Sequence, residues 1–218
     1  LPNDNNLVSE NRYTYHEDGR IKIEANFKNS NLVSQTRYAY NYNKQIKNKR
    51  NFKTGKLFSQ TDFYYYDNGQ IMKEENYKEG KKNGKWTEWY ENGQKKAEEN
   101  YYNGKFYGKV TSWYENGQMS EKINYKDNKR DGKATYWYEN GQIEEEVIYK
   151  NDKKVSRTIY TYHENSQKQQ EGNYKDHKKD GNWTWWHENG QINSEKNYKD
   201  GNLVSETQYV YNDNFQIL

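Results

Sequence analysis

The chain has 218 residues, a formal net charge of +3 and no cysteine, which excludes disulfides and thiolate metal sites. Tyr, Trp and Phe make up 17% of the residues, and this argues against disorder because disordered chains are poor in aromatic residues. No apolar run approaches the roughly 20 residues that a membrane-spanning helix needs. We therefore expect a folded chain in which Tyr and Trp replace aliphatic side chains as the buried material.

A repeat of about 24 or 25 residues fills almost the whole sequence. Its reference position is the Gln that follows an Asn-Gly pair. This Gln recurs at Gln70, Gln94, Gln118, Gln142, Gln167 and Gln191, with weaker copies at Arg20, Gln45 and Gln216. A fixed period in this range predicts a tandem array of structural repeats.

Each repeat has the pattern of a β-hairpin. One aromatic residue lies five residues before the reference Gln and another lies seven residues after it. These two structural columns include Tyr65, Trp89, Trp113, Trp137, Tyr162 and Trp186, and then Tyr77, Tyr101, Tyr125, Tyr149, Tyr174 and Tyr198. The Asn-Gly pair between them is a strong hairpin signal, because both residues tolerate positive φ. The predicted fold is all-β: an elongated, single-layer antiparallel meander of about nine hairpins.

In chain order, we expect one array over residues 1–218. Its units are about 7–31, 32–56, 57–81, 82–105, 106–129, 130–153, 154–178, 179–202 and 203–218. The first strand is expected to open at Leu7-Val8-Ser9, and the last unit stops two residues into its second strand. Bare strand edges at the ends of an array invite pairing, so end-to-end or edge self-association is a further expectation.

The hairpins are joined by two classes of linking turn. One class contains Val-Ser or Phe-Ser, as at Phe58-Ser59, and the other contains a glycine, as at Gly84, Gly108, Gly132 and Gly181. Seven residues before the reference position, the first class has an aromatic residue and the second has Thr. We interpret the Gly turn as bringing the backbone closer, and the Val-Ser turn as a longer one that leaves space for a ring.

The motif Gly-Lys-Trp-x-x-Trp-Tyr-Glu-Asn-Gly-Gln, followed by Glu-x-Asn-Tyr-Lys-x-Gly, resembles the bacterial variant of the MORN repeat. Residues 84–104, 108–126 and 181–201 carry the closest copies. The resemblance implies a β-hairpin array and supplies no catalytic residues. It also implies two settings, since many bacterial members are labelled antitoxin components and others look like secreted or surface proteins.

Aromatic residues on alternate positions of several strands predict a candidate binding face. Its members are Trp86, Tyr90, Tyr114, Tyr136, Tyr138, Trp183, Trp185 and His187. Exposed rings provide contact area at low entropy cost and can hold sugars or proteins. The alternative interpretation is that the same rings form a second layer of packing.

Cationic residues of the linking turns predict a basic edge along one side of the array. Its members are Lys81, Lys82, Lys105, Lys129, Arg130, Lys153, Lys154, Lys178 and Lys179. Such an edge attracts acidic partners, for example lipid headgroups or sulfated glycans, or it serves only solubility. Nucleic acid is not an expected partner, because Asp residues interrupt the edge and weaken phosphate contacts.

Neither catalysis nor a metal or other cofactor is expected. Asp and Glu recur in step with the repeat, whereas a catalytic pair is singular. His16, His163 and His187 occupy one repeat position, where two successive residues lie too far apart for one metal ion. The turns offer only one or two acids each, fewer ligands than a calcium loop needs.

The resulting functional hypothesis is a non-enzymatic scaffold that binds a protein or an acidic carbohydrate surface and mediates adhesion or partner interaction. A secreted or cell-surface location is expected, because the sequence begins Leu1-Pro2 without a Met. Two alternatives stay open: an intracellular antitoxin-like protein that neutralises a toxin, and a structural spacer of a larger protein.

Overall fold

The computed structural model describes residues 9–212 and 217, and every regular element in them is a β-strand. The chain divides into two compact halves, Leu1–Phe106 (the N-terminal half) and Tyr107–Leu218 (the C-terminal half). The predicted strand start at Leu7-Val8 and residues 213–216 and 218 of the final repeat lie outside the described residues.

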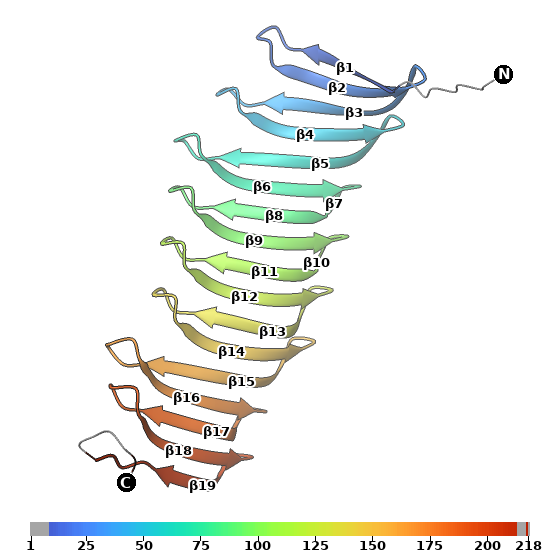
Figure 1. Ribbon diagram of the computed structural model, residues 1–218. Helices are drawn as coiled ribbons and strands as arrows, with labels where there is room; N and C mark the ends of the chain where they lie inside the picture. Colours follow the sequence, from blue (N-terminus) through green and yellow to red (C-terminus); the bar gives the residue numbers. More distant parts are fainter. Residues whose placement is uncertain (1–8, 213–216, 218) are drawn as a thin grey trace, which may run out of the picture. The chain divides into compact units, whose positions relative to one another are not determined.

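The strands of each half follow one another as an antiparallel meander (Figure 1). The N-terminal half contains β1 (Ser9–Tyr15), β2 (Ile21–Lys28), β3 (Asn31–Tyr40), β4 (Ile46–Lys53), β5 (Lys56–Tyr65), β6 (Ile71–Lys78), β7 (Lys81–Lys82), β8 (Gly84–Trp89), β9 (Lys95–Tyr102) and β10 (Lys105–Phe106). The C-terminal half contains β11 (Gly108–Trp113), β12 (Met119–Lys126), β13 (Lys129–Trp137), β14 (Ile143–Lys150), β15 (Lys153–Tyr162), β16 (Lys168–Lys175), β17 (Lys178–Trp186), β18 (Ile192–Lys199) and β19 (Asn202–Gln208). The all-β meander of hairpin repeats that the sequence predicts is therefore confirmed.

The Asn-Gly turns use only glycine, not asparagine, at positive φ. In the turn between β13 and β14, the Gly141 amide donates to the carbonyl of Tyr138 at 2.9 Å, and Gly141 has φ +86°. This is a type I turn followed by a glycine bulge. Asn140 contributes through its side chain, because its Oδ1 accepts a hydrogen bond from the Gln142 amide at 3.0 Å. The expectation that both residues of the pair adopt positive φ is corrected in this respect.

The linking turns are the two-residue turns in which both residues have positive φ. Between β12 and β13, Lys126 pairs with Lys129 and only two residues lie between them. These are Asp127 at φ 51° and Asn128 at φ 67°. Two successive left-handed residues define the type I′ turn, whose twist matches that of the flanking strands.

The two classes of linking turn differ in the bulge that follows them. In the Val-Ser class, Tyr149 pairs with Lys154 and Ile148 with Ser156, so that Val155 is one extra residue. In the Gly class, residues 131–133 lie opposite the single residue 124. The Gly link therefore has the larger bulge, although repeats with a Val-Ser link are one residue longer in sequence.

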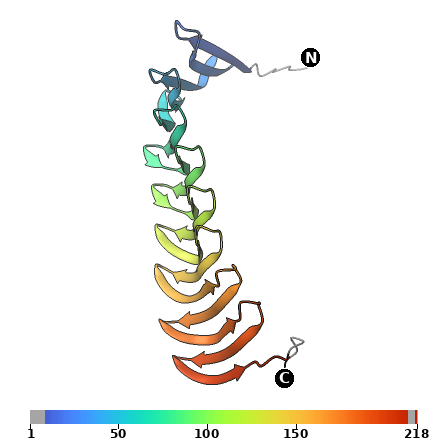
Figure 2. The same ribbon diagram turned by 90° about the vertical axis from the view of Figure 1, so that its left-hand side faces the viewer.

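The core lies on one face of the strands, here called the tyrosine face, which carries the column from Tyr77 to Tyr198. In the C-terminal half, Ile123, Ala134, Val147 and Tyr149 are buried together on this face. A flat single layer would leave such side chains open to water. The hairpins of this half are bent into arcs (Figure 2), and we infer that this bending gathers the side chains of the tyrosine face against one another. The other column, from Tyr65 to Trp186, is half-buried and points to the opposite face, because neighbouring strand residues alternate.

Candidate binding surfaces

Trp86 and Trp183 from the predicted binding face are almost completely buried, with 3% and 2% of their surface exposed. Each indole Nε1 donates a hydrogen bond to a backbone carbonyl of the preceding repeat. Trp86 donates to Asn76 at 2.7 Å and Trp183 donates to Asn173 at 2.9 Å. Both carbonyls lie opposite the large bulge of a Gly link, where the regular strand pairing is interrupted. These two Trp residues are therefore packing residues, not an open contact surface.

The other members of the predicted face are divided between two places. Tyr90, Tyr114, Tyr138 and His187 are the first residues of type I turns, at the edge of the strands. The Tyr114 hydroxyl donates to the carbonyl of Trp137 at 2.7 Å, so this side chain ties one repeat to the next. Tyr136 and Trp185 lie half-buried on the tyrosine face. The ring centroids of Trp185 and Trp183 are 5.9 Å apart. The predicted stripe is therefore not continuous.

The second cation of several linking turns covers an aromatic ring of the tyrosine face. The Nζ of Lys82 lies 3.9 Å from the Trp86 ring centroid, and that of Lys179 lies 4.0 Å from the Trp183 ring. The Arg130 guanidinium lies 4.3 Å from the Tyr149 ring. Such cation–π contacts stabilise by about 0.5–2 kcal/mol. These three members of the predicted basic edge therefore belong to the packing of the fold.

In five of the linking turns the first cation is exposed and faces another lysine directly across the turn. The opposed pairs are Lys53 with Lys56, Lys78 with Lys81, Lys126 with Lys129, Lys150 with Lys153, and Lys175 with Lys178. All ten side chains are exposed. Like charges directly opposite each other destabilise a strand pair. We use the name Lys-pair edge for these residues within each half: four lie in the N-terminal half and six in the C-terminal half.

Aspartates neutralise part of the positive charge of the Lys-pair edge. Lys150 pairs with Asp131 at 3.1 Å, and its hydrogen bond holds the pKa of Asp131 below the usual range. In the described part of the chain, Lys129, Lys153 and Lys178 have no ion pair within 4.0 Å. The edge therefore presents several lysine head groups to solvent.

The opposite edge, formed by the type I turns, is acidic and joined from repeat to repeat. It carries Glu115, Glu139, Glu164 and Glu188 in the C-terminal half. Asn116 Nδ2 donates to the carbonyl of Glu139 at 2.8 Å, and Tyr162 donates to the carbonyl of Ile143 at 2.9 Å. These bonds between neighbouring repeats give the regular spacing of the turns a direct structural cause.

Within residues 9–212 and 217, no group of three or more His, Cys, Asp or Glu side chains is arranged to hold a metal ion. His163 Nε2 lies 2.8 Å from the carbonyl of Trp186, in the same position as the Tyr114 hydroxyl of another repeat. In the same described residues, no helix is long and apolar enough to span a membrane.

The fold and these surfaces define a protein of tandem antiparallel β-hairpin repeats. The profile of the MORN repeat variant matches residues 11–29, 63–79, 82–103, 106–127, 130–151, 158–176 and 179–200, which together are more than half of the chain. The chain belongs to this family. No curated protein matches it.

Several solved structures match this chain at low identity. A crystal structure of TcdB2-TccC3-TEV is 10% identical, covers 93% of this chain and 14% of that chain, and has a TM-score of 0.30. The Photorhabdus luminescens Tc holotoxin pore is 11% identical, with coverages of 92% and 15% and a TM-score of 0.29. A Bacteroides fragilis protein of unknown function is 10% identical, with coverages of 79% and 94% and a TM-score of 0.18. This chain spans only a small part of the first two, and TM-scores this low support no functional argument.

Proposed function

We propose that the chain is a non-enzymatic binding scaffold whose Lys-pair edge binds an acidic partner surface. One observation carries the proposal: lysines oppose each other across five linking turns. Each opposed pair is destabilising, because like charges lie directly opposite each other. Solubility alone does not require charges of one sign to face each other, whereas an acidic partner bound across the turns would neutralise both.

Because Trp residues of the predicted aromatic face are buried, the Lys-pair edge is the better candidate for the binding surface. Trp86 and Trp183 are enclosed, and cations cover their rings. The exposed lysine head groups recur from turn to turn, and this suits a partner with repeated acidic groups. We extend the proposal to a surface-exposed or secreted setting and to adhesion, where partners of this kind are abundant.

A charge-matched pair of variants tests the proposal. In the first, Lys126, Lys129, Lys175 and Lys178 of the Lys-pair edge are changed to Gln. In the control, four lysines from other positions of the C-terminal half are changed to Gln: Lys109, Lys122, Lys133 and Lys168. Retention on a heparin column and co-sedimentation with vesicles that contain phosphatidylserine are measured at increasing salt.

The edge variant should elute at clearly lower salt than the control, although the two have equal net charge. Its melting temperature should be unchanged or higher, because two repulsive lysine pairs have been removed. Native binding should weaken as salt screens the charges. Equal losses in the two variants would mean that only net charge matters, and they would refute a binding edge. Retention of native binding by both would leave the spacer role as the better hypothesis.

A further inference from the structure

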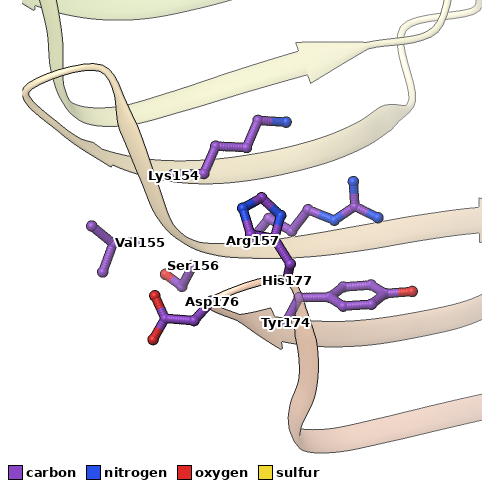
Figure 3. Close-up of a pocket in the computed structure, with 7 residues that line it drawn as sticks. All are labelled: Lys154, Val155, Ser156, Arg157, Tyr174, Asp176 and His177. Atoms are coloured by element: carbon purple, nitrogen blue, oxygen red, sulfur yellow. The ribbon is translucent and has the colours of Figure 1, made fainter. Parts of the chain in front are cut away.

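A cavity of about 260 Å³ lies where the start of β15 meets the end of β16 and the turn that follows it. Its lining residues are Lys154, Val155, Ser156, Arg157, Tyr174, Asp176 and His177 (Figure 3). Val155 is the extra residue of the bulge in this link. The turn is tied to the bulge, since the Asp176 amide donates to the Val155 carbonyl at 3.4 Å.

The same cavity recurs in the N-terminal half, in another repeat with a one-residue bulge. It has a volume of about 320 Å³ and is lined by Leu57, Ser59, Gln60, Asp62, Tyr77, Glu79 and Gly80. Six of these positions are equivalent to lining positions of the first cavity, and in both the Ser, the Tyr and the turn carboxylate are present. The backbone of the Val/Phe-Ser link therefore builds the cavity, and the other side chains decide its charge.

The cavity of the C-terminal half combines apolar walls with cations. Tyr174 and Val155 supply apolar surface, and the Arg157 guanidinium lies 4.5 Å from the Tyr174 ring centroid. The ion pairs that Arg157 and Lys154 make with Glu145 are long, at 3.4 and 3.5 Å. Charge-assisted hydrogen bonds are normally about 2.7–2.9 Å long. Both cations thus keep donors for a further anionic partner, whereas Gln60 and Leu57 occupy these positions in the other cavity.

His177 is an unusual residue for its position. It is the second residue of a type I′ turn and has φ 65°. The equivalent residues in the other linking turns are Gly, Asn, Asp or Ser, all of which have smaller side chains than His. Only in this turn of the described residues does the position carry a ring, and the ring lines the cavity.

We infer that this cavity is a subsite for one anionic pyranose unit, such as a uronic acid, of an acidic glycan bound along the Lys-pair edge. The inference rests on the proposed function, and it names the partner class. The apolar side of the sugar ring would lie against Val155 and the edge of the Tyr174 ring, whose face the Arg157 guanidinium covers. Its acid group would pair with Arg157 and Lys154, while Ser156 and Asp176 provide partners for hydroxyl groups. The cavity is of a size that one sugar ring can occupy.

The test uses the full chain and three simple probes: sodium glucuronate, glucose and sodium acetate. NMR titrations follow the Val155 methyl groups and the His177 and Tyr174 rings. Glucuronate should shift these signals in a saturable way, with at least a tenfold lower Kd than either glucose or acetate. Acetate that produces the same shifts at the same concentrations would reduce the cavity to a site for any small anion, and it would overturn the inference.

Two variants reproduce residues of the other cavity and should therefore fold. Arg157→Gln and His177→Gly should each weaken glucuronate binding at least tenfold. His177→Gly also relieves backbone strain, so an unfolded chain cannot explain its loss of binding. The control is Asn128→Gly, the same turn position in a Gly-class link, which should keep native affinity. Affinity within twofold of native in both cavity variants would contradict the inference.

The outcomes separate this inference from the proposed function. If glucuronate leaves the cavity signals unchanged while the Lys-to-Gln edge variant still loses heparin binding, the subsite is refuted and the basic-edge function stands. If glucuronate binds but the edge variant retains heparin as well as the native chain, the edge proposal is refuted and the subsite is retained.

Discussion

Replacing Gly172 by Ala tests how the repeats pack, because a single methyl group meets a ring that has no room to move. Gly172 in β16 pairs directly with Trp183 in β17. A Cβ at this position would lie 2.5 Å from Cδ2 and Cε3 of Trp183 and 2.6 Å from Cζ3. The backbone itself is not in the left-handed region, so the clash is the only obstacle.

Trp183 is held from several sides and cannot easily yield. Its Nε1 donates to Asn173, and the rings of Tyr174 and Tyr198 lie 5.1 and 6.0 Å from its centroid. Gly→Ala in a compatible strand stabilises by about 0.4–1 kcal/mol, whereas overpacking a core costs about 1–3 kcal/mol. We expect Gly172→Ala to destabilise the fold by about 1–2 kcal/mol on balance.

The decisive measurement is a double-mutant cycle with Trp183→Ala. Removing the indole should cost about 3–5 kcal/mol, and Gly172→Ala should then become neutral or stabilising, since its clash is gone. The coupling energy should be about 2 kcal/mol, within the range for residues in contact. Urea unfolding followed by far-UV circular dichroism gives the midpoint and slope for all four chains. The packing argument would be refuted if the Gly172→Ala chain were at least as stable as the native chain. It would also be refuted if Gly172→Ala changed the free energy of unfolding equally with and without the Trp183 side chain.

Three further predictions concern other parts of the fold. Tyr149→Ala should lower the free energy of unfolding by about 3–5 kcal/mol because the ring is buried, while Lys129→Ala should stay within about 0.5 kcal/mol; equal urea midpoints would contradict this. Burial, with nearby carboxylates, raises the pKa of Tyr160 to about 12, so its contribution to stability is full below about pH 10 and is lost as pH rises through 12. Melting curves between pH 9 and 12 should fall less steeply for Tyr160→Phe, and parallel curves would count against the shift. Asn116→Ala removes hydrogen bonds within its turn and to the next turn, and thermal melts should show a loss of about 1–2 kcal/mol.

The fold class followed from local patterns. The repeat period, the alternation around Trp89 or Tyr101 and the Asn-Gly pairs all act over a few residues, and a hairpin is itself a local structure. The family resemblance and the meander of strands could therefore be predicted from the sequence. The strand bounds are set by turn chemistry that is visible in the same way, because Asn, Asp and Gly recur at each turn.

The turn types were harder to predict, because the two types of turn in this chain have similar residue compositions. Asn140 and Asp127 both stand in short polar turns, yet only Asp127 has positive φ. The difference arises because the side chain of Asn140 accepts the Gln142 amide, and this bond is compatible with a type I turn. Composition alone does not reveal which of the two arrangements closes the hairpin.

The candidate site depended on contacts between repeats. Sequence alternation placed Trp86 and Trp183 in a binding stripe, but bulges and hydrogen bonds from neighbouring strands enclose them. Likewise, Lys178 and Lys179 are adjacent in the sequence, yet one faces solvent across from Lys175 and the other covers Trp183. The cavity beside His177 was not predicted, although a histidine in a glycine-type turn position was a usable signal.

The sequence by itself determined the hairpin repeat, its two alternating edges of charge and the use of aromatic residues as core, because each depends on near neighbours along the chain. Only the tertiary structure decided which rings are buried, which lysines are exposed and where Lys154, Arg157, Tyr174 and His177 meet. The physical reason is that burial and cavity shape arise when one repeat packs on the next. A bulge of one or two residues changes that packing, while the sequence period changes only between 25 and 24 residues.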